Sequence, residues 1–245
     1  MLLIRSVLFD VLLYSLMLVM GIVCSPLALI SREWTVRVMQ WYCHISLWML
    51  RVICGLRVEV RGNVPRGEVV VASKHQSFLD IIIHTSTLPR PRFIMKEELK
   101  WVPIFGVYAL RMGSTPVARG RKGAAVREMV NAAEKSGAGG GQLVIYPQGT
   151  RLAPGVSAPY KVGAGVLYQR MGVACVPAAT NAGVFWGRKS VLRRPGLAVV
   201  EYLEPIAPGL DLQAFLGRVE AEVEAASDRL LEEATGAADT LSAAS

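Results

Sequence analysis

The chain has 245 residues, carries a formal net charge of +8, and has a hydrophobic content of 52% with a mean hydropathy of +0.38. This length allows one large α/β domain with a sizeable core and is too short for two such domains. A chain that is both basic and this apolar is untypical of soluble nucleic-acid-binding proteins. It fits an anionic membrane surface instead, where each Lys or Arg contributes roughly 1 kcal/mol of attraction.

The first segment of the chain is almost entirely apolar. Between Val7 and Ile30 the only charged residue is Asp10. A helix needs about 20 apolar residues to span a bilayer, and residues 11–30 just supply them, although we expect Pro26 to break the helix near its end. A signal peptide is the competing interpretation, but no A-x-A-like cleavage site follows the apolar run.

A second apolar segment, residues 34–54, is rich in tryptophan and carries Arg37, His44 and Arg51 at intervals of seven residues. That spacing places the three polar side chains on roughly one face, as in an amphipathic helix that lies at a membrane interface. We therefore predict that residues 1–54 form a two-helix hairpin that associates with a membrane. The alternative is that both helices pack on a soluble core.

Strand and helix signals alternate through the rest of the chain. Strands are predicted at residues 56–61, 68–73, 92–95, 142–146, 173–178 and 197–203, and helices near 78–88, 102–111, 122–135 and 162–171. Such alternation predicts the α/β class, a mixed sheet flanked by helices, in one domain over residues 55–234. Residues 211–233 are predicted to form an amphipathic helix, and the Ala/Ser/Thr-rich tail at 235–245 is predicted to be disordered.

The stretch V-V-V-A-S-K-H-Q-S-F-L-D carries the first candidate for chemistry, because a buried strand ends there just before His75 and Asp80. Within one helix, side chains five residues apart point about 140° away from each other. They can meet if a helix begins between them, and Ser77 followed by Asp80 resembles a capping box. A carboxylate on Nδ1 would leave Nε2 as a base that takes a proton from a hydroxyl. The alternative is that Asp80 only caps the helix and His75 is a surface turn residue.

Three later clusters stand where strands should end. A strand delivers Lys96 to an apolar turn, and a basic run follows with Arg119, Arg121 and Lys122. Guanidinium groups and helix N-termini both favour phosphate oxygens, so this run is a candidate anion site. Read alone, Lys96 is an ordinary surface residue and the basic run is a solvated loop.

The third cluster is L-V-I-Y-P-Q-G-T-R, a buried strand that ends in a proline and a glycine turn. The backbone amides of this turn, together with Thr150 and Arg151, can hold an anion. A match of three residues, Gly149 to Arg151, is weak when taken alone.

In this order, the blocks resemble those of the glycerolipid acyltransferases, and most closely those of the 1-acylglycerol-3-phosphate (lysophosphatidic acid) acyltransferases. The resemblance covers roughly residues 56–203. The family pattern N-H-x-x-x-x-D is matched from Lys74 to Asp80. K-x-E-L…P-x-F-G is matched by residues 96–106, a block ending in a basic residue by 116–119, F-P-E-G-T-R by 146–151, and V-P-V/A by 176–178.

The resemblance implies a His75/Asp80 dyad that acts on a hydroxyl, an apolar tunnel for the acyl chain, and a site for the acceptor's phosphate. The implied reaction transfers an acyl chain from acyl-CoA or acyl-carrier protein to the free hydroxyl of a lysophospholipid, 1-acylglycerol-3-phosphate, and gives phosphatidic acid. The implied substrate-binding residues are Lys96, Arg119, Gln148, Gly149, Thr150 and Arg151.

Two residues depart from the family pattern. Lys74 replaces the asparagine before the histidine, and we expect it to add a positive charge near the acyl donor or the headgroup. Gln148 replaces the glutamate of F-P-E-G-T-R, and its amide keeps the size of that residue and can still hydrogen-bond to a hydroxyl but lacks the negative charge. We therefore expect no acid or base role for Gln148.

The residue inventory favours direct attack of the hydroxyl on the thioester. The sequence contains no G-x-S-x-G elbow, and none of its four cysteines has the context of a nucleophile, so an acyl-enzyme is not expected. The three histidines, His44, His75 and His84, predict no metal cluster, and the reaction needs no cofactor. The absence of a C-x-x-C pair indicates a reduced, cytoplasmic setting for the cysteines.

We therefore predict a membrane-associated enzyme at the cytoplasmic face of the inner membrane, with the bilayer and its two substrates as partners and no nucleic acid. Two alternatives stay open. One is an acyltransferase for another lysolipid, such as a lyso-ornithine lipid, and the other is a non-catalytic lipid-binding protein of the same fold. Release of a thiol from an acyl thioester distinguishes an enzyme from the second alternative.

Overall fold

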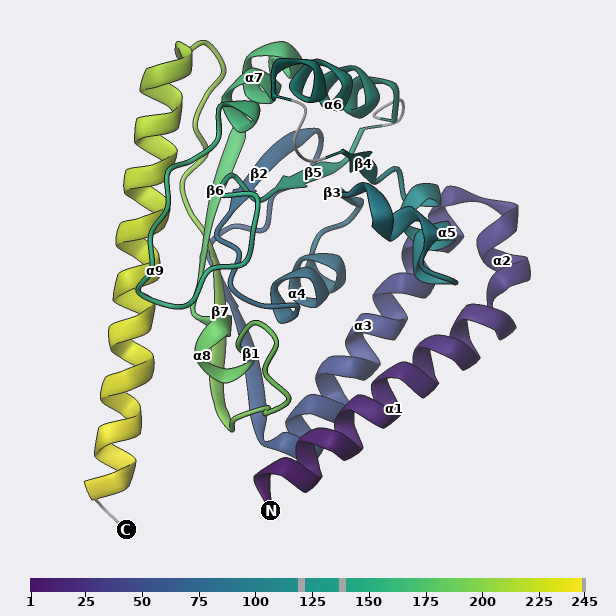
Figure 1. The fold of residues 1–245 in the computed structure, drawn as a ribbon, viewed down its shortest axis with the longest axis vertical. Coiled ribbons are helices and arrows are strands. Elements are labelled where there is room, and N and C mark those ends of the chain that lie inside the picture. Colours follow the sequence, from purple (N-terminus) through teal and green to yellow (C-terminus); the bar gives the residue numbers. More distant parts are fainter. Residues whose placement is uncertain (119–121, 137–139, 244–245) are drawn as a thin grey trace.

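A computed structural model gives the fold of the chain and describes residues 1–118, 122–136 and 140–243 (Figure 1). Its centre is a seven-stranded sheet with the strand order β1-β7-β6-β2-β5-β3-β4. All neighbouring strands pair in parallel except β6 and β7, which are antiparallel, so the predicted mixed α/β sheet is confirmed. The strands are β1 (Leu56–Arg61), β2 (Val69–Ser73), β3 (Pro91–Lys96), β4 (Thr115–Val117), β5 (Gln142–Ile145), β6 (Cys175–Thr180) and β7 (Gly196–Tyr202).

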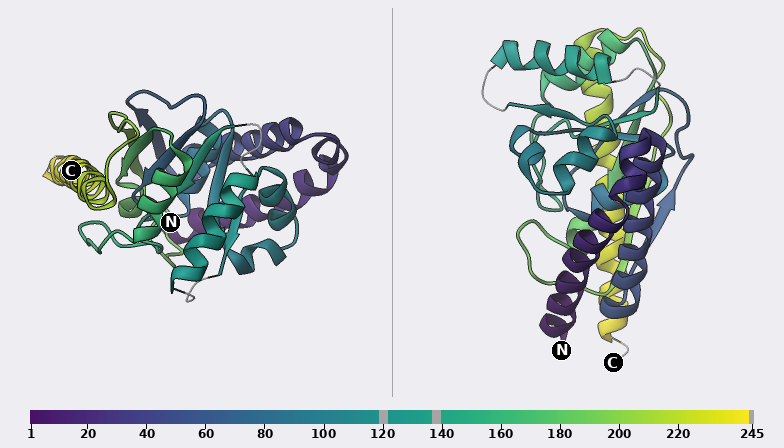
Figure 2. Two further views of the ribbon diagram at one scale, coloured as in Figure 1. Left: turned by 90° about the horizontal axis from the view of Figure 1, so that it is seen from above. Right: turned by 90° about the vertical axis from the view of Figure 1, so that its right-hand side faces the viewer.

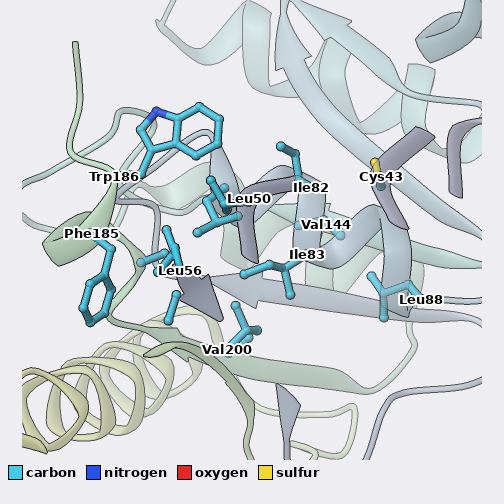
Figure 3. Packing of buried hydrophobic residues seen from close by; sticks show 14 of the residues in the cluster. Cys43, Leu50, Leu56, Ile82, Ile83, Leu88, Val144, Phe185, Trp186 and Val200 are labelled. Carbon is cyan, nitrogen blue, oxygen red and sulfur yellow. The ribbon is translucent and has the colours of Figure 1, made fainter. Parts of the chain in front are cut away.

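Helices cover both faces of the sheet. Successive residues of the central strands therefore enter different cores: Val71 and Val144 belong to one, and Val70 and Leu143 to the other. Burial on both faces explains why β2 and β5 are continuous apolar runs and not alternating patterns. The first core lies under α4 (Leu79–Thr87), α8 (Ala182–Phe185) and the N-terminal helices (Figure 3), and the second lies under α6 (Lys122–Ser136), α7 (Val162–Met171) and α9 (Leu212–Ala243).

The apolar N-terminus forms three helices, α1 (Leu2–Val23), α2 (Ser25–Ile30) and α3 (Arg32–Cys54). The helix is interrupted just before Pro26, as expected, and Pro26 lies in the first turn of α2, where its missing N–H is not needed. The apolar run at residues 11–30 is therefore divided at Cys24. Among the described helices, only α1, with 22 residues and a mean hydropathy of 2.2, has the length and composition to cross a membrane.

α1 and α3 lie side by side as a hairpin (Figure 1; Figure 2, right). α3 exposes Arg37, His44 and Arg51, as predicted, and its opposite face packs on the first core together with Phe9 and Leu13 of α1. The hairpin thus packs on the core by one face, as the alternative interpretation expected, and leaves apolar residues exposed on the other face. The exposed apolar residues of α1 are Leu3, Ile4, Val7, Leu8, Val11, Leu12, Tyr14, Leu18, Val19, Ile22 and Val23.

A single residue joins the hairpin to the sheet. α3 ends at Cys54, and β1 begins at Leu56. Between them, Gly55 adopts a left-handed conformation with a φ of 71°, which glycine reaches without steric cost. The chain therefore turns from α3 into the sheet without a linker.

The shortest elements and two helix boundaries differ from the sequence-based expectation. β4 and α8 have three and four residues, lengths that contain too little of a hydrophobic period to be recognised. The helix expected at 102–111 is present as α5 (Phe105–Arg111), three residues shorter at its start, and a 3-10 turn, η1 (Glu97–Trp101), precedes it. α9 continues to Ala243, into the tail expected to be disordered from residue 235, because alanine favours helix even without an apolar stripe.

Candidate active site

His75 and Asp80 lie on either side of the start of α4, as the sequence predicts. His75 follows β2 in a loop, and Asp80 lies in the first turn of the helix. Nδ1 of His75 is 3.1 Å from Oδ2 of Asp80. The same oxygen accepts hydrogen bonds from the backbone N–H groups of Gln76 and Ser77, both at 2.8 Å. Asp80 therefore holds the loop that leads into the helix and orients the imidazole at once.

Burial holds the two side chains in this geometry. Asp80 has no exposed side-chain surface, and 12% of His75 is exposed. Oδ1 of Asp80 accepts a further hydrogen bond from Oγ1 of Thr180 at 3.3 Å. Because Nδ1 faces a buried carboxylate, the imidazole proton is assigned to Nδ1, and Nε2 is the nitrogen that can accept a proton from a substrate.

The ring of His75 stacks on Tyr146, which follows β5, with 3.8 Å between the centroids and 15° between the planes. Burial raises the pKa of Tyr146 well above its usual value, and the negative charge of Asp80 raises it further, against an opposing effect of Arg151. Tyr146 therefore stays neutral and serves as a flat packing surface for the imidazole. The influence of Arg151 on Tyr146 also means that its guanidinium lies within electrostatic reach of this stack.

The glycine turn after β5 is tied to the histidine loop through the backbone, because the N–H of Leu152 donates to the carbonyl of His75 at 2.9 Å. Gly149 has a φ of 71°, a left-handed conformation that favours glycine, and a Cβ atom there would lie 2.6 Å from Nζ of Lys161. Lys161 thus places an ammonium group beside the turn that ends in Arg151. No sequence motif pointed to Lys161, although its position just before α7 marks it as the residue at a helix N-terminus.

The other predicted substrate-binding residues are distributed more widely. Gly149, Thr150 and Arg151 are together in the turn, and Thr150 and Arg151 are half-buried. Lys96 ends β3, is 46% exposed and forms an ion pair with Glu98 at 2.9 Å. β5 separates β3 from β2, so Lys96 lies at the same sheet edge as the histidine loop but two strands away. Arg119 lies outside the described residues.

Lys74 and Gln148, the two departures from the family pattern, are both buried and both contact Glu224 of α9. Nζ of Lys74 lies 2.5 Å from Oε2 of Glu224, and Nε2 of Gln148 donates to Oε1 at 3.2 Å. The expectation that Lys74 adds a positive charge near the substrates is therefore wrong, because Glu224 neutralises the ammonium group. Gln148 donates its amide hydrogen to a protein carboxylate, a contact between residues 76 positions apart in the chain.

His84 has a structural place next to this site. Its Nδ1 lies 2.9 Å from the hydroxyl of Tyr202 and its Nε2 lies 2.9 Å from Oγ of Ser73. Burial lowers the pKa of His84 to about 4, although the charge of Asp80 acts in the opposite direction. His84 is therefore neutral near pH 7. Within the described parts of the chain, no group of three His, Cys, Asp or Glu side chains could hold a metal ion.

An apolar cavity lies between the hairpin on one side and helices α4 and α5 on the other. Its lining includes Met17 and Gly21 of α1, Tyr42 of α3, Phe78 and Ile104. Phe78 stands between His75 and Asp80 in the chain, so one wall of the cavity adjoins the pair. Ile104 has a φ of 63°, which is strained for a β-branched residue, and it packs so closely on Gly21 that a Cβ there would lie 2.3 Å from its Cγ2.

A protein-family model described as Acyltransferase matches residues 56–181, from the start of β1 to just beyond β6. The chain belongs to the acyltransferase family. This acyltransferase is 29% identical over 198 residues to the 1-acyl-sn-glycerol-3-phosphate acyltransferase of Pseudomonas aeruginosa, a match that covers 79% of this chain and 77% of the relative. It is 31% identical over 185 residues to the alpha form of that enzyme from Homo sapiens, covering 72% of this chain and 65% of the relative.

The acyltransferase shares its fold with the 1-acyl-sn-glycerophosphate (LPA) acyltransferase of Thermotoga maritima, with a TM-score of 0.77 over 94% of this chain and 98% of the other, at 20% identity. The family resemblance and the enzyme class inferred from the sequence are confirmed. Membership implies an acyl donor and an acyl acceptor as substrates. His75, Asp80 and the turn at 149–151 lie inside the matched residues, whereas the N-terminal hairpin and α9 lie outside them.

Proposed function

We propose that this acyltransferase transfers an acyl chain from acyl-CoA or acyl-carrier protein to the free hydroxyl of 1-acylglycerol-3-phosphate and forms phosphatidic acid. The observation that carries the proposal is the 3.1 Å contact between His75 and Asp80, in a loop that is hydrogen-bonded to the turn bearing Arg151. A base and positive charges in one place suit an acceptor that has both a hydroxyl and a phosphate. The names of the relatives from Pseudomonas aeruginosa and Homo sapiens support this acceptor.

In the proposed mechanism, Nε2 of His75 takes the proton of the acceptor hydroxyl while its oxygen attacks the carbonyl carbon of the thioester. The tetrahedral intermediate then collapses, the carbon–sulfur bond breaks, and the proton passes from Nε2 to the departing thiolate. The products are the new ester and a free thiol. Asp80 keeps the ring in the required tautomer and stabilises the imidazolium, because its carboxylate faces Nδ1.

We assign the acceptor's phosphate to the turn after β5. Arg151 and Lys161 supply positive charge there, and guanidinium groups bind phosphate oxygens through paired hydrogen bonds. Gly149 allows the phosphate to approach the backbone closely. Thr150 adds a hydroxyl to the same turn. Arg119, Lys96 and Gln148 complete the proposed substrate-binding set on their motif positions alone.

We assign the acyl chain to the apolar cavity beside α4. Its lining is almost wholly apolar, as an alkyl chain requires, and Phe78 connects its wall to the loop of His75. The hairpin forms the opposite wall through Met17, Gly21 and Tyr42. An acyl chain that enters the cavity therefore lies between the helices that face the membrane and the site of the reaction.

We place the enzyme at the cytoplasmic face of the inner membrane, with the hairpin in one leaflet. The exposed apolar residues of α1 and the exposed Trp41 and Trp48 of α3 support this position. Asp10 of α1 also pairs with Arg193, in the loop before β7, at 2.7 Å. This ion pair binds α1 to the catalytic domain, which suits a helix that lies along the domain better than one that leaves it to cross the bilayer.

Release of free thiol from an acyl thioester tests the proposal. Full-length wild-type protein should release thiol fastest with 1-acylglycerol-3-phosphate, and His75→Ala should lower kcat by roughly 10²- to 10⁴-fold. His44→Ala is the matched control, because His44 lies on the exposed face of α3 and should keep wild-type activity. Faster turnover with a lyso-ornithine lipid would replace the proposed acceptor, and lipid binding without thiol release would contradict catalysis.

A further inference from the structure

One carboxylate on α9 receives hydrogen bonds from three separate segments of the chain. Nζ of Lys74 donates to Oε2 of Glu224 at 2.5 Å. The hydroxyl of Tyr160 and Nε2 of Gln148 donate to Oε1 at 3.0 and 3.2 Å. Lys74 also donates to the carbonyl of Val156 at 3.1 Å, so its ammonium group is held on two sides.

Two of these three donors directly precede, in the chain, the proposed base and the proposed phosphate site. Lys74 directly precedes His75, and Gln148 directly precedes the turn at 149–151. The Lys74 side chain is 2% exposed and that of Glu224 is 18% exposed, so this ion pair is shielded from water. A buried charge that loses its partner is strongly unfavourable, and each side chain therefore holds the other in place.

Lys74 and Gln148, the two departures from the family motif, both contact the carboxylate of Glu224, and together they balance its charge and its hydrogen bonds. The motif F-P-E-G-T-R has a glutamate at the position of Gln148. A glutamate at position 148 would bring a second carboxylate to the 3.2 Å contact with Glu224, and two such groups repel when both are ionised. Gln148 avoids this repulsion and donates a hydrogen bond instead, while Lys74 neutralises the one carboxylate that is present.

We propose that Glu224 is a positioning residue for acyl transfer, which supplies from α9 the carboxylate that the family motif carries at position 148. Through Lys74 and Gln148, Glu224 holds the loop of His75 at a set distance from the turn that carries Arg151. The distance between the base and the phosphate site then matches the distance between the hydroxyl and the phosphate of the acceptor. This inference rests on the proposed function, and it requires no contact between Glu224 and a substrate.

Relocating the carboxylate tests the inference. Gln148→Glu and Glu224→Gln are made singly and together in the full-length protein, and kcat and KM for acceptor and donor are measured by thiol release with 1-acylglycerol-3-phosphate. Each single variant should lower kcat/KM for the acceptor at least roughly ten-fold. Gln148→Glu places two carboxylates in contact, and Glu224→Gln leaves none. The double variant again has one carboxylate opposite one amide, and it should recover to within roughly three-fold of wild type.

Two controls separate positioning from general stability. Glu222→Gln removes the same charge from the same helix but breaks only a partly exposed pair with Arg218, so it should behave as wild type. Melting temperatures of all variants show whether the singles are folded, and a positioning role predicts that folded single variants lose kcat and acceptor affinity while KM for the donor changes little.

Single variants with wild-type kcat and KM would overturn the inference. So would a double variant whose loss equals the product of the single losses, because relocation would then restore nothing. Either result with an active wild-type protein leaves the proposed function standing. Absence of thiol release by the wild-type protein would overturn the proposed function and this inference together.

Discussion

Replacing Asp80 with asparagine separates the charge of this residue from its geometry. Oδ2 of Asp80 accepts from two backbone N–H groups and faces His75, and the amide oxygen of asparagine can do the same. The amide nitrogen would then face Oγ1 of Thr180, which donates to the carbonyl of Val199 at 2.9 Å and can accept a hydrogen bond. Asp80→Asn therefore keeps the shape and the hydrogen bonds of the site and loses the negative charge.

The expected loss of rate follows from the distance between the two groups. Unit charges 3.1 Å apart interact by about 5 kcal/mol at an effective dielectric constant of about 20. This value is an upper limit, because the imidazole is only partly charged in the transition state and 12% of His75 is exposed to water. Taking about half of that energy, kcat should fall roughly 10²-fold, since about 1.4 kcal/mol corresponds to a factor of ten.

Thiol release at saturating concentrations of both substrates measures kcat for Asp80→Asn. KM for the acceptor should stay within about three-fold of wild type, because Asp80 has no exposed surface with which to touch a substrate. Asp211→Asn is the matched control, since Asp211 also accepts two backbone hydrogen bonds at a helix start, that of α9. A kcat of Asp80→Asn within about three-fold of wild type would refute the argument that the carboxylate charge stabilises the imidazolium.

Three other substitutions test the packing around the site. Burial lowers the pKa of His84 from 6.5 to about 4, so the unfolded chain binds more protons between these values. The unfolding free energy should therefore fall by about 3 kcal/mol as the pH drops through this range, and melting curves should show a smaller fall for His84→Gln. Gly21→Val should lower the melting temperature and favour shorter acyl donors in a chain-length panel, because its Cβ would meet Ile104 at 2.3 Å and overpacking costs about 1–3 kcal/mol. Asp10→Asn leaves Arg193, with 6% of its side chain exposed, without its carboxylate, and chemical denaturation in detergent should show a loss of about 2 kcal/mol.

Each of these substitutions has an outcome that contradicts its argument. The same pH dependence in wild type and His84→Gln would assign the proton uptake to another group. An unchanged chain-length preference in Gly21→Val would separate the cavity from the acyl chain. Full stability of Asp10→Asn would mean that Arg193 is held by its stacking on Trp186, at 4.0 Å from the ring centroid, and not by the ion pair.

The parts of the site that were predicted from the sequence depend on short stretches of chain. β2, the start of α4 and the contact between His75 and Asp80 all lie within residues 69–87, where a buried run, a capping pattern and a fixed spacing occur together. The position of the glycine turn after β5 follows from the same kind of local signal. Motif order then identified the family, although each block taken alone was weak.

The contacts that were missed are distant in the sequence. Glu224 is 150 residues from Lys74, and nothing in the pattern of an amphipathic helix separates this glutamate from its neighbours on α9. Lys161 approaches Gly149 only because α7 begins beside the turn. The interpretation of Lys74 was wrong for the same reason, because the charge of a side chain is visible in the sequence but its partner is not.

The single residue between α3 and β1 has a consequence for how the enzyme responds to its lipid surroundings. Because Gly55 alone joins the hairpin to the sheet, the catalytic domain cannot swing on a tether when the hairpin shifts. With the hairpin in one leaflet, as proposed, its depth determines the height of His75 above the acyl region. A hairpin that tilts in the leaflet must then tilt the whole molecule, so the orientation of α1 and α3 also sets the orientation of His75 towards the acyl region.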